Sequence, residues 1–197
     1  MGDKMEMYEV ILEILEKNGP KSIPGICQEM NQLPFYQRSK EKPVLPAHVK
    51  LAITRKKELF KVCNNIVFID PEKNMQSLEV NLSGSEGPSL TIRVDFLKNN
   101  FSYFEWNFDS PSKSNSRFPP QRGFEDVGIF KKEIYRLKLW KWDADYQPET
   151  MILDGICWSV KLVTTGKVYE SQGLQQFPKE WTRFSRGLRR LIGLSVI

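Results

Sequence analysis

The chain has 197 residues, of which 40% are hydrophobic and 27% are charged, a composition typical of globular proteins. This length excludes a miniprotein held together by disulfide bonds, and it allows one large domain or two small ones. The 29 basic residues against 24 acidic ones give a net charge of +5, which permits a polyanionic partner without demonstrating one.

Neither a membrane segment nor a disulfide framework is indicated. No stretch approaches the roughly 18 uncharged apolar residues that a membrane-spanning helix needs, and the N-terminus lacks the basic start and apolar run of a signal peptide. Cys27, Cys63 and Cys157 are far apart and lack Cys-x-x-Cys spacing, which favours reduced thiols over a zinc site or disulfides. We therefore expect a cytoplasmic protein with no membrane partner.

The first third of the chain predicts three helices. Apolar residues at helical spacing predict a first helix over 3–17, which the turn Asn18-Gly19-Pro20 ends. Ser22 is expected to cap a short second helix. The segment 33–45, which contains prolines and several charges, is expected to be an exposed connection, and a third helix is expected over 46–59.

A β-hairpin is predicted after these helices. Two short β-rich runs, 60–63 and 66–69, are separated by Asn64-Asn65, two residues that tolerate positive φ. Three helices followed by a two-stranded ribbon is the order of a winged-helix domain. The segments "ILEILEKNGPKSIPGICQEM", "VKLAITRKKELFKV" and "NNIVFID" resemble winged-helix modules of the HARE-HTH kind, which are attached to restriction endonucleases and chromatin proteins. This resemblance covers residues 3–72.

The remaining residues predict an antiparallel β-sheet with a C-terminal helix. Alternation of apolar and polar residues is typical of half-buried strands. The expected strands are 78–82, 90–96, 101–108, 134–142, 156–162 and 168–171. A segment rich in serine and proline, 109–128, is predicted to be a long loop, and Pro178 is expected to begin the terminal helix.

The predicted fold class is α+β, with an N-terminal winged helix-turn-helix domain over 1–73 and an antiparallel sheet domain with a C-terminal helix over 74–197. One of the expected strands has an alternative. In 134–142 the alternation favours a strand, but Phe130, Ile134 and Leu137 also suit a helix.

The strings "WKWDADYQPETMILDGICWSVKL" and "SQGLQQFPKEWTRF" resemble domains of unknown function that recur in bacterial, phage and other mobile-element proteins. The shared features are a Trp-to-Tyr segment, an Asp-Gly-x-x-Trp turn and strand, and a Gly-to-Pro-to-Trp helix start. In this chain they are Trp142, Tyr146, Asp154-Gly155, Trp158, Gly173, Pro178 and Trp181. The resemblance covers about residues 130–192 and implies no activity.

The net charge is distributed unevenly along the chain. Residues 3–17 hold five acidic and two basic side chains, whereas 36–57 hold seven basic side chains against Glu41 alone. A basic helix beside a basic loop neutralises several phosphates of duplex DNA and releases counterions. The predicted nucleic-acid-binding residues are His48, Lys50, Thr54, Arg55, Lys56, Lys57, Lys61, Asn64, Asn65, Arg38, Lys40 and Lys42.

The winged-helix resemblance implies which of these residues meet bases and which meet phosphates. In such domains the third helix commonly enters the major groove, which implies that His48, Lys50, Leu51, Thr54 and Arg55 face the groove. Lys57, Lys61 and the wing asparagines would then meet phosphates. Only Arg55 offers bidentate recognition of guanine, so the sequence gives little indication of sequence-specific readout. The alternative is that 50–57 form the solvated face of a helix in a protein–protein module.

Two further basic clusters lie in the second domain. One consists of Lys131, Lys132, Arg136, Lys138 and Lys141, and the other of Lys179, Arg183, Arg186, Arg189 and Arg190. In the second cluster Arg183, Arg186 and Arg190 recur at i, i+3 and i+7 and form a candidate second basic patch. The outer face of an ordinary amphipathic helix is the favoured interpretation of this stripe. Neighbouring tryptophans suggest stacking on single strands, but core packing explains most of them.

Most common catalytic signatures are absent from the sequence. His48 is the only histidine, and no Gly-rich phosphate-binding loop is present, so we predict no cofactor, no metal site and no catalytic residue. The arrangement nearest to a metal-dependent nuclease is Asp154 with Lys161 and Glu170, or Asp95 with Glu105 on adjacent strands.

The sequence therefore favours a non-catalytic protein that binds nucleic acid, duplex DNA in the first place, with a second domain for homodimerisation or partner binding. The alternative is an interaction module, for example a mobile-element inhibitor whose partner is a host protein that handles nucleic acid. A metal-dependent nuclease is the third hypothesis.

Overall fold

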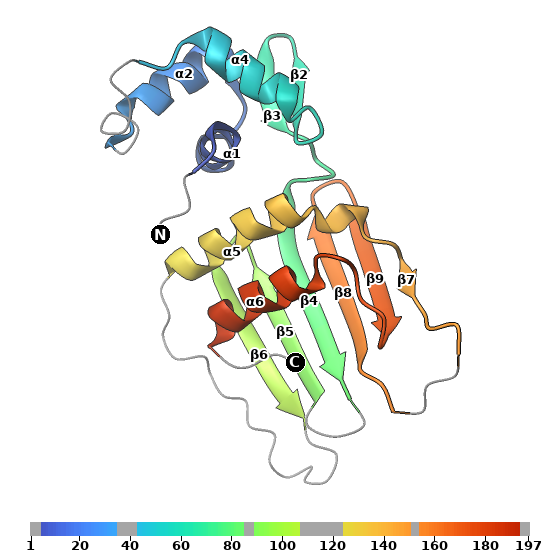
Figure 1. Cartoon of the computed structure of the whole chain (residues 1–197). Coiled ribbons are helices and arrows are strands. Elements are labelled where there is room, and N and C mark those ends of the chain that lie inside the picture. Colours follow the sequence, from blue (N-terminus) through green and yellow to red (C-terminus); the bar gives the residue numbers. More distant parts are fainter. Residues whose placement is uncertain (1–4, 35–42, 85–88, 107–123, 151–153, 194–197) are drawn as a thin grey trace. The chain divides into compact units, whose positions relative to one another are not determined.

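The computed structural model describes residues 5–34, 43–84, 89–106, 124–150 and 154–193. The chain divides into two compact units, Met1–Asn74 and Met75–Ile197 (Figure 1), which we call unit 1 and unit 2. Each unit has its own core and its own sheet.

The described part of unit 1 consists of three helices and a small sheet. Its elements in chain order are α1 (Met7–Asn18), β1 (Lys21–Ser22), α2 (Ile23–Gln32), α4 (Pro46–Arg55), β2 (Phe60–Cys63) and β3 (Ile66–Ile69). The strands are antiparallel and lie in the order β1-β3-β2. This is the element order of a winged helix, in which the β2–β3 hairpin is the wing.

The ends of the first two helices follow from residues that the sequence places there. The backbone N–H of Glu6 donates to Glu9 Oε2 at 2.9 Å, so the side chain of the first turn satisfies a group at the start of α1. Gly19 follows α1 with a φ of 75°, a conformation that glycine adopts without strain. Ser22 Oγ accepts a hydrogen bond from the Gly25 N–H at 3.2 Å and caps α2, as predicted.

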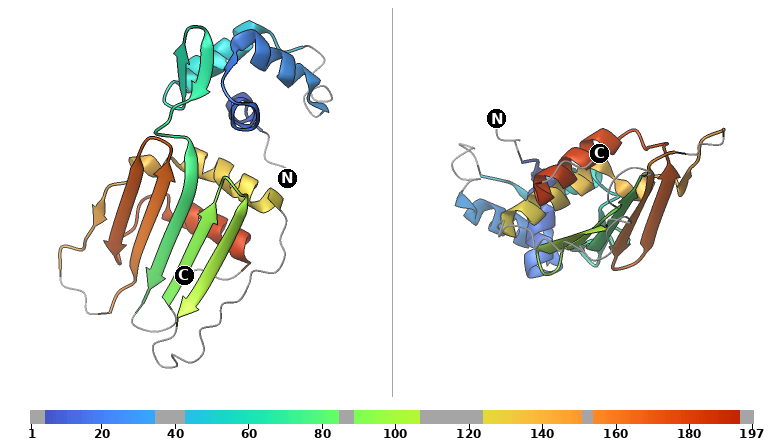
Figure 2. Two further views of the ribbon diagram at one scale, coloured as in Figure 1. Left: turned by 180° about the vertical axis from the view of Figure 1, so that it is seen from behind. Right: turned by 90° about the horizontal axis from the view of Figure 1, so that it is seen from below.

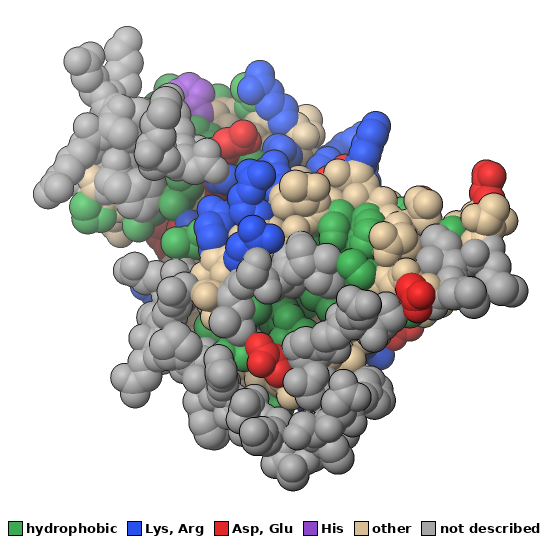
Figure 3. All heavy atoms as spheres, turned by 60° about the horizontal axis from the view of Figure 1, so that its bottom comes forward, with side chains coloured by type: hydrophobic (Ala, Val, Ile, Leu, Met, Phe, Trp, Pro, Cys, Tyr) green, Lys and Arg blue, Asp and Glu red, His purple; other side chains and the backbone are tan. Residues whose placement is uncertain are grey.

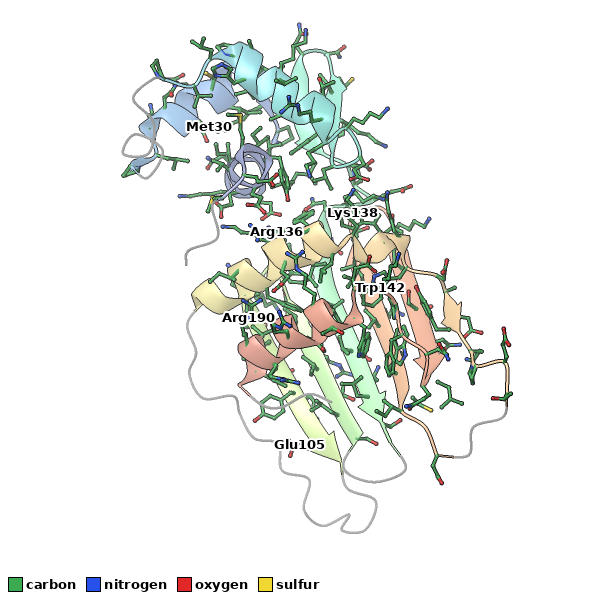
Figure 4. All side chains as sticks on the ribbon, viewed as in Figure 1. Met30, Glu105, Arg136, Lys138, Trp142 and Arg190 are labelled. Atoms are coloured by element: carbon green, nitrogen blue, oxygen red, sulfur yellow. The ribbon has the colours of Figure 1, made fainter. Side chains whose placement is uncertain are left out.

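The core of unit 1 receives side chains from each helix and from the wing. Fully buried residues are Ile11 of α1, Ile26 and Met30 of α2, Val49 of α4 and Val67 of β3. Met30 lies among the three helices (Figure 4). The buried residues of α1, α2 and α4 recur at helical spacing, which explains why three short amphipathic helices form one packed unit.

The connection between α2 and α4 is anchored at its second end. Asn31 Oδ1 accepts from the Val44 N–H at 2.8 Å, and Asn31 Nδ2 donates to the Val44 carbonyl at 3.0 Å. Val44 is buried, which departs from the prediction that 33–45 is exposed throughout. The central part of this connection, 35–42, lies outside the described residues.

Unit 2 is built on a six-stranded sheet. Its elements are β4 (Met75–Ser83), β5 (Ser89–Asp95), β6 (Asn100–Trp106), α5 (Phe124–Leu137), the 3-10 helix η1 (Leu139–Lys141), β7 (Asp145–Tyr146), β8 (Cys157–Thr164), β9 (Val168–Leu174) and α6 (Trp181–Ile192). The strand order is β6-β5-β4-β8-β9-β7, and every pair is antiparallel except β7 with β9.

Helices α5 and α6 cover one face of this sheet (Figures 1 and 2). The covered face carries the apolar half of each alternating strand, with Val80 of β4, Ile92 of β5 and Leu162 of β8 almost completely buried. α6 contributes Phe184 and Leu188, which are also fully buried. The unit is therefore a two-layer α/β sandwich with its core between the helices and one side of the sheet.

One predicted strand is wrong. The segment 134–142 contains the end of α5, followed by η1. Phe130, Ile134 and Leu137 are buried, and their helical spacing was the signal for α5. Lys138 adopts a left-handed conformation with φ 56°, which ends α5 and begins η1. The predicted loop 109–128 is also too long, because α5 begins at residue 124, and 109–123 lies outside the described residues.

An aromatic cluster occupies the covered face beside α6. The rings of Trp158 and Trp181 lie 4.7 Å apart between centroids, and Trp142 lies 5.2 Å from Phe184. Figure 4 labels Trp142 within this cluster. The Trp158 Nε1–H donates to the Gln176 carbonyl at 2.7 Å. Core packing therefore accounts for these tryptophans, which is the interpretation that the sequence favoured.

Polar side chains on the opposite face of the sheet pair with one another across the strands. One row runs through Ser102, Arg93, Glu79, Lys161 and Glu170, from β6 to β9. Arg93 Nε donates to Glu79 Oε2 at 2.8 Å, and Lys161 Nζ lies 2.7 Å from Glu170 Oε1. Because the four charges alternate in sign, this row is electrically neutral. We call the surface the open face, since neither helix of unit 2 covers it (Figure 2).

The predicted α+β class is confirmed, with N-terminal helices and a small sheet followed by a mostly antiparallel sheet and a C-terminal helix. Among the described residues, no helix combines the length and the apolar character that a membrane crossing requires.

Candidate nucleic-acid interface

The register of α4 decides which of the predicted interface residues point outward. Val49 and Ile53 are buried in unit 1, where α4 packs against α1 and α2. Successive residues are about 100° apart around a helix, so Leu51 lies at the middle of the opposite face, with Thr54 and Arg55 on either side of it. All three are exposed. We call this surface, together with the flanking His48 and Lys50, the α4 face.

Two residues of the α4 face also hydrogen-bond to the helix backbone. His48 Nδ1 accepts from the Leu45 N–H at 3.3 Å, so this side chain caps the first turn. Thr54 Oγ1 donates to the Lys50 carbonyl at 2.9 Å. Both side chains therefore contact the helix backbone in addition to lining its surface.

Two of the predicted phosphate-binding lysines have partners within unit 1. Lys56 Nζ lies 4.2 Å from the centroid of the Tyr8 ring, a cation–π contact that joins the end of α4 to α1. Lys61 Nζ lies 3.4 Å from Asp70 Oδ2, across the base of the wing. These contacts make Lys56 and Lys61 weaker candidates for a ligand contact than the other basic residues around α4.

The remaining basic residues of this region have no acidic partner in the described part of the chain. Lys50, Arg55 and Lys57 are exposed, and none of them forms an ion pair with a described residue. They lie within two turns of one another on or just after α4. An anionic ligand at the α4 face would therefore meet three uncompensated positive charges.

The wing ends in a tight turn that presents two polar side chains. Asn64 and Asn65 have φ values of 50° and 62°, the signature of a type I′ turn, and the strands on either side pair Cys63 with Ile66. Both asparagines are exposed. This confirms the predicted hairpin and places the two residues at the tip of the wing. Arg38, Lys40 and Lys42 of the predicted interface lie outside the described residues.

Apolar side chains are also exposed on unit 1. Leu51 is 49% exposed at the centre of the α4 face, and Leu45 is 52% exposed at its start. On the wing, Val62 is 54% exposed and Ile66 is 39% exposed. Apolar residues on a basic surface suit contact with a thymine methyl group, but they also suit a protein partner.

The candidate second basic patch lies on α6. Arg183, Arg186 and Arg190 are exposed on the outer side of the helix, and Arg190 is labelled in Figure 4. Glu133 of α5 reaches two of them, with Oε1 3.4 Å from Arg183 Nε and Oε2 2.5 Å from Arg190 Nη2. The patch is thus partly paired within unit 2.

The other basic cluster, 131–141, does not form a strand surface as the predicted fold implied. Lys131 is nearly buried, with Nζ 5.7 Å from the centroid of the Phe96 ring, whereas Lys141 is exposed in η1. The helix turns these residues to different sides, so they form no single row.

The structure does not assemble the proposed nuclease residues. Lys161 and Glu170 form an ion pair on the open face. Lys161 lies about 13 Å along β8 from Cys157, and Asp154 precedes that strand, so Asp154 is remote from the pair. Within the residues that the structure describes, no three His, Cys, Asp or Glu side chains are grouped to hold a metal ion.

Asp95 and Glu105, the second arrangement considered for a nuclease, do not converge. Asp95 lies opposite Asn100 at one end of the β5–β6 pair, whereas Glu105 lies opposite Leu90 at the other end. The two carboxylates also belong to opposite faces of the sheet. Asp95 follows Val94 and therefore lies on the face opposite to Val94. Glu105 follows Phe104, which is itself on the face opposite to Val94, so Glu105 lies on the same face as Val94. Asp95 instead accepts hydrogen bonds from the backbone N–H groups of the turn that follows it.

Sequence reasoning missed the partners of the basic residues. The Tyr8–Lys56 contact and the ion pairs of Glu133 join positions 48 or more residues apart, so no local pattern signals them. The helical spacing of Phe130 and Ile134 was the one signal that placed Glu133 on a helix.

Comparisons of the chain with protein-family models, with curated protein sequences and with solved structures found no match. The two family resemblances therefore stay predictions from the sequence.

Proposed function

We propose that the protein binds duplex DNA through unit 1, without catalysis, using the α4 face and the wing. The observation that carries this proposal is the positive charge on the exposed side of α4, unpaired among the described residues. The helix turns Val49 and Ile53 into the core, and it exposes Lys50 and Arg55, with Lys57 just beyond, without an acidic partner among the described residues. Two cations on this short helix and a third just after it, none paired with a described acidic residue, form a basic surface that suits a phosphate backbone.

The geometry of a winged helix supports duplex DNA over other polyanions. An α-helix with one exposed face fits the major groove, and a hairpin whose tip carries Asn64 and Asn65 has the size to contact the adjacent backbone. The single arginine of the α4 face, Arg55, limits base-specific readout, so affinity is expected to depend on salt more than on sequence.

A salt titration of the full chain tests this function. The variant carrying Arg55→Glu and Lys57→Glu should bind a short DNA duplex at least about tenfold more weakly, and the slope of log affinity against log salt should fall by about 2. A variant carrying Lys98→Glu and Lys167→Glu has the same change in net charge at two exposed turns of unit 2 and should bind as the wild type does.

Two results would contradict this proposal. If the wild type shows no salt-sensitive binding to duplex DNA, or if the Arg55/Lys57 variant binds as tightly as the Lys98/Lys167 variant, the α4 face is not a DNA-binding surface. Single-stranded DNA and RNA in the same titration show whether another nucleic acid is the preferred ligand.

A protein partner that handles nucleic acid is the second candidate. The exposed Leu51 at the centre of the α4 face favours it, because an apolar residue surrounded by charges is typical of the core and rim of an interface. Leu51→Asp should then abolish association with that partner in a pull-down from host extract. Unchanged recovery of the same partner by the variant would exclude Leu51 from the interface.

Dimerisation or partner binding through unit 2 is part of the same proposal. β6 is the outer strand of the sheet and is paired on one side only among the described strands, and Phe104 on it is 44% exposed. Sedimentation of the wild type and of Phe104→Lys should show a dimer that the variant loses.

The three free cysteines agree with a reducing, cytoplasmic location.

A further inference from the structure

The outer face of α6 carries arginine as its only charged residue type. Residues 181–192 contain no Asp or Glu, and the exposed positions are Thr182, Arg183, Arg186, Arg189 and Arg190. The inner positions are buried against unit 2, namely Trp181, Phe184, Leu188 and Leu191. Because packing fixes the inner side, the arginines are held outward. We call this surface the α6 face, and Figure 3 shows basic side chains gathered over α5 and α6.

Glu133 is an acidic partner of this face among the residues that the structure describes. Its side chain is 12% exposed, and its carboxylate contacts both Arg183 and Arg190, which lie two turns apart on α6. It holds the first and last arginines in defined positions, with Arg186 between them.

The folding of α6 does not by itself account for all of these arginines. Cations near the C-terminus of a helix interact favourably with its dipole, which accounts for Arg189 and Arg190. Arg183 lies in the first turn, where a cation is unfavourable, and Arg186 lies in the middle, where the dipole has no effect. A solvated helix surface ordinarily mixes both signs of charge, and the α6 face does not.

We propose that the α6 face binds the phosphate backbone of nucleic acid, as a second contact for the DNA that unit 1 is proposed to bind. Arg183 and Arg190 are about 10.5 Å apart along the helix axis at 1.5 Å per residue. One strand of duplex DNA carries about three phosphates over that length. Arg183, Arg186 and Arg190, which recur at i, i+3 and i+7, therefore match the density of charge along a single backbone strand. This inference rests on the proposed function only for the identity of the ligand.

The packing of α6 favours a nucleic acid over a lipid surface. Amphipathic helices that bind membranes insert their apolar face into the lipid, and here that face is buried in the core with Phe184 and Leu188 fully inaccessible. Guanidinium groups also offer paired donors that match phosphate oxygens. Only the charged side of α6 is available, and it suits a backbone that is charged along its whole length.

The loss-of-charge experiment uses the full chain. Arg186→Glu with Arg189→Glu should weaken binding to a short DNA duplex by about tenfold or more and lower the salt slope by about 2. The Lys98→Glu and Lys167→Glu variant is again the control for net charge. Circular dichroism should show that all variants stay folded. An unchanged slope in the α6 variant, with DNA binding otherwise intact, would overturn the inference.

A gain-of-charge experiment distinguishes binding from a structural role. Glu133→Gln keeps the shape of the side chain and removes the charge that faces Arg183 and Arg190, so duplex affinity and salt slope should both rise. A face that serves only the fold would leave both unchanged. A variant that lost DNA affinity while remaining folded would also contradict the proposal.

The two proposals fail in different ways. If the Arg55/Lys57 variant binds DNA normally while the Arg186/Arg189 variant does not, the α4 face fails and the α6 face stands. The opposite result leaves the α4 face and overturns the α6 face. Vesicles containing phosphatidylserine complete the test, because vesicle binding that depends on Arg186 and Arg189 without DNA binding would assign the α6 face to a lipid surface instead.

Discussion

The two faces of the unit 2 sheet are held in place by different kinds of interaction. The covered face is packed with aromatic and aliphatic side chains, and Trp158 lies so close to Gly173 that no side chain fits between them. The open face carries charged residues that alternate in sign across the strands, such as Arg93, Glu79 and Lys161. The first face depends on burial and close contact, and the second on exposed ion pairs.

This difference has a consequence for function as well as for stability. Exposed ion pairs contribute little to folding, whereas a close-packed core contributes most of it. The open face also cancels its own charge, and the side of the unit covered by helices presents the arginines of α6. A net charge of +5 for the whole chain conceals this separation, because it sums surfaces that are neutral with surfaces that are strongly positive.

The largest effect is expected at Gly173 on the covered face. A Cβ atom there would lie 2.7 Å from the Gln176 carbonyl oxygen and 2.7 Å from Trp158 Nε1, both well inside contact distance. Gly173→Ala should therefore lower the free energy of unfolding by about 2 to 3 kcal/mol, because either the backbone or the buried indole must move. Urea unfolding followed by tryptophan fluorescence measures the change.

Gly128 provides the matched control. It lies in α5, and a Cβ atom there would meet nothing within 4 Å. Gly128→Ala should raise the free energy of unfolding by about 0.5 to 1 kcal/mol, since alanine favours helix over glycine. If Gly173→Ala behaved like Gly128→Ala, the covered face would not be packed as closely as the structure shows.

Much of this fold follows from local sequence patterns, and the exceptions have physical reasons. The hairpin around Asn64-Asn65 was predictable because turn residues and β-rich runs adjoin in the sequence. The end of α5, from Ile134 on, was predicted as a strand because alternating residues there overlapped a helical stripe. The strands β1 and β7 have two residues each and pair with partners far along the chain, so no local period marks them.

The candidate site was likewise only partly predictable from the sequence. The outward positions of α4 follow from helical periodicity, so the exposure of Lys50 and Arg55 was predictable from the buried Val49 and Ile53. The partners that weaken or organise the charges were not predictable. Lys56 meets Tyr8 only because α4 packs across α1, and contacts of that kind depend on tertiary structure.

A smaller effect is expected for Glu79, on the open face. Burial raises the pKa of this carboxyl, but hydrogen bonds from Arg93 and Asn81 and the nearby charges outweigh it, so the pKa is lowered overall. A lowered pKa in the folded state stabilises the protein above the pKa of the unfolded state, and this contribution is lost as the pH falls through the folded value. Wild type should exceed Glu79→Gln by about 0.5 kcal/mol at neutral pH.

Thermal unfolding at a series of pH values measures this difference. The gap between wild type and Glu79→Gln should be constant above about pH 5, where the carboxyl is ionised in both states, and should close as the solution becomes more acidic. A stability difference between wild type and Glu79→Gln that widened in acid, or that exceeded about 2 kcal/mol at neutral pH, would contradict this prediction. The ion pairs of the open face would then stabilise the fold as a buried network does.

The smallest effect is expected for the ion pair between Lys161 and Glu170. The hydrogen bond that Lys161 donates to Glu170, and the charge of that carboxylate, raise the pKa of Lys161, so any stabilisation is present at neutral pH and is lost as the pH rises through the raised value. Both side chains are more than half exposed, at 52% and 65%, and solvent screens the pair. A double-mutant cycle with Lys161→Gln and Glu170→Gln should therefore give a coupling energy within the error of urea unfolding. A clear coupling energy would show that the cross-strand row acts as one network, in which the neighbouring Glu79 and Arg93 lower the mobility of Lys161. The covered face and the open face would then differ only in how much each contributes to stability.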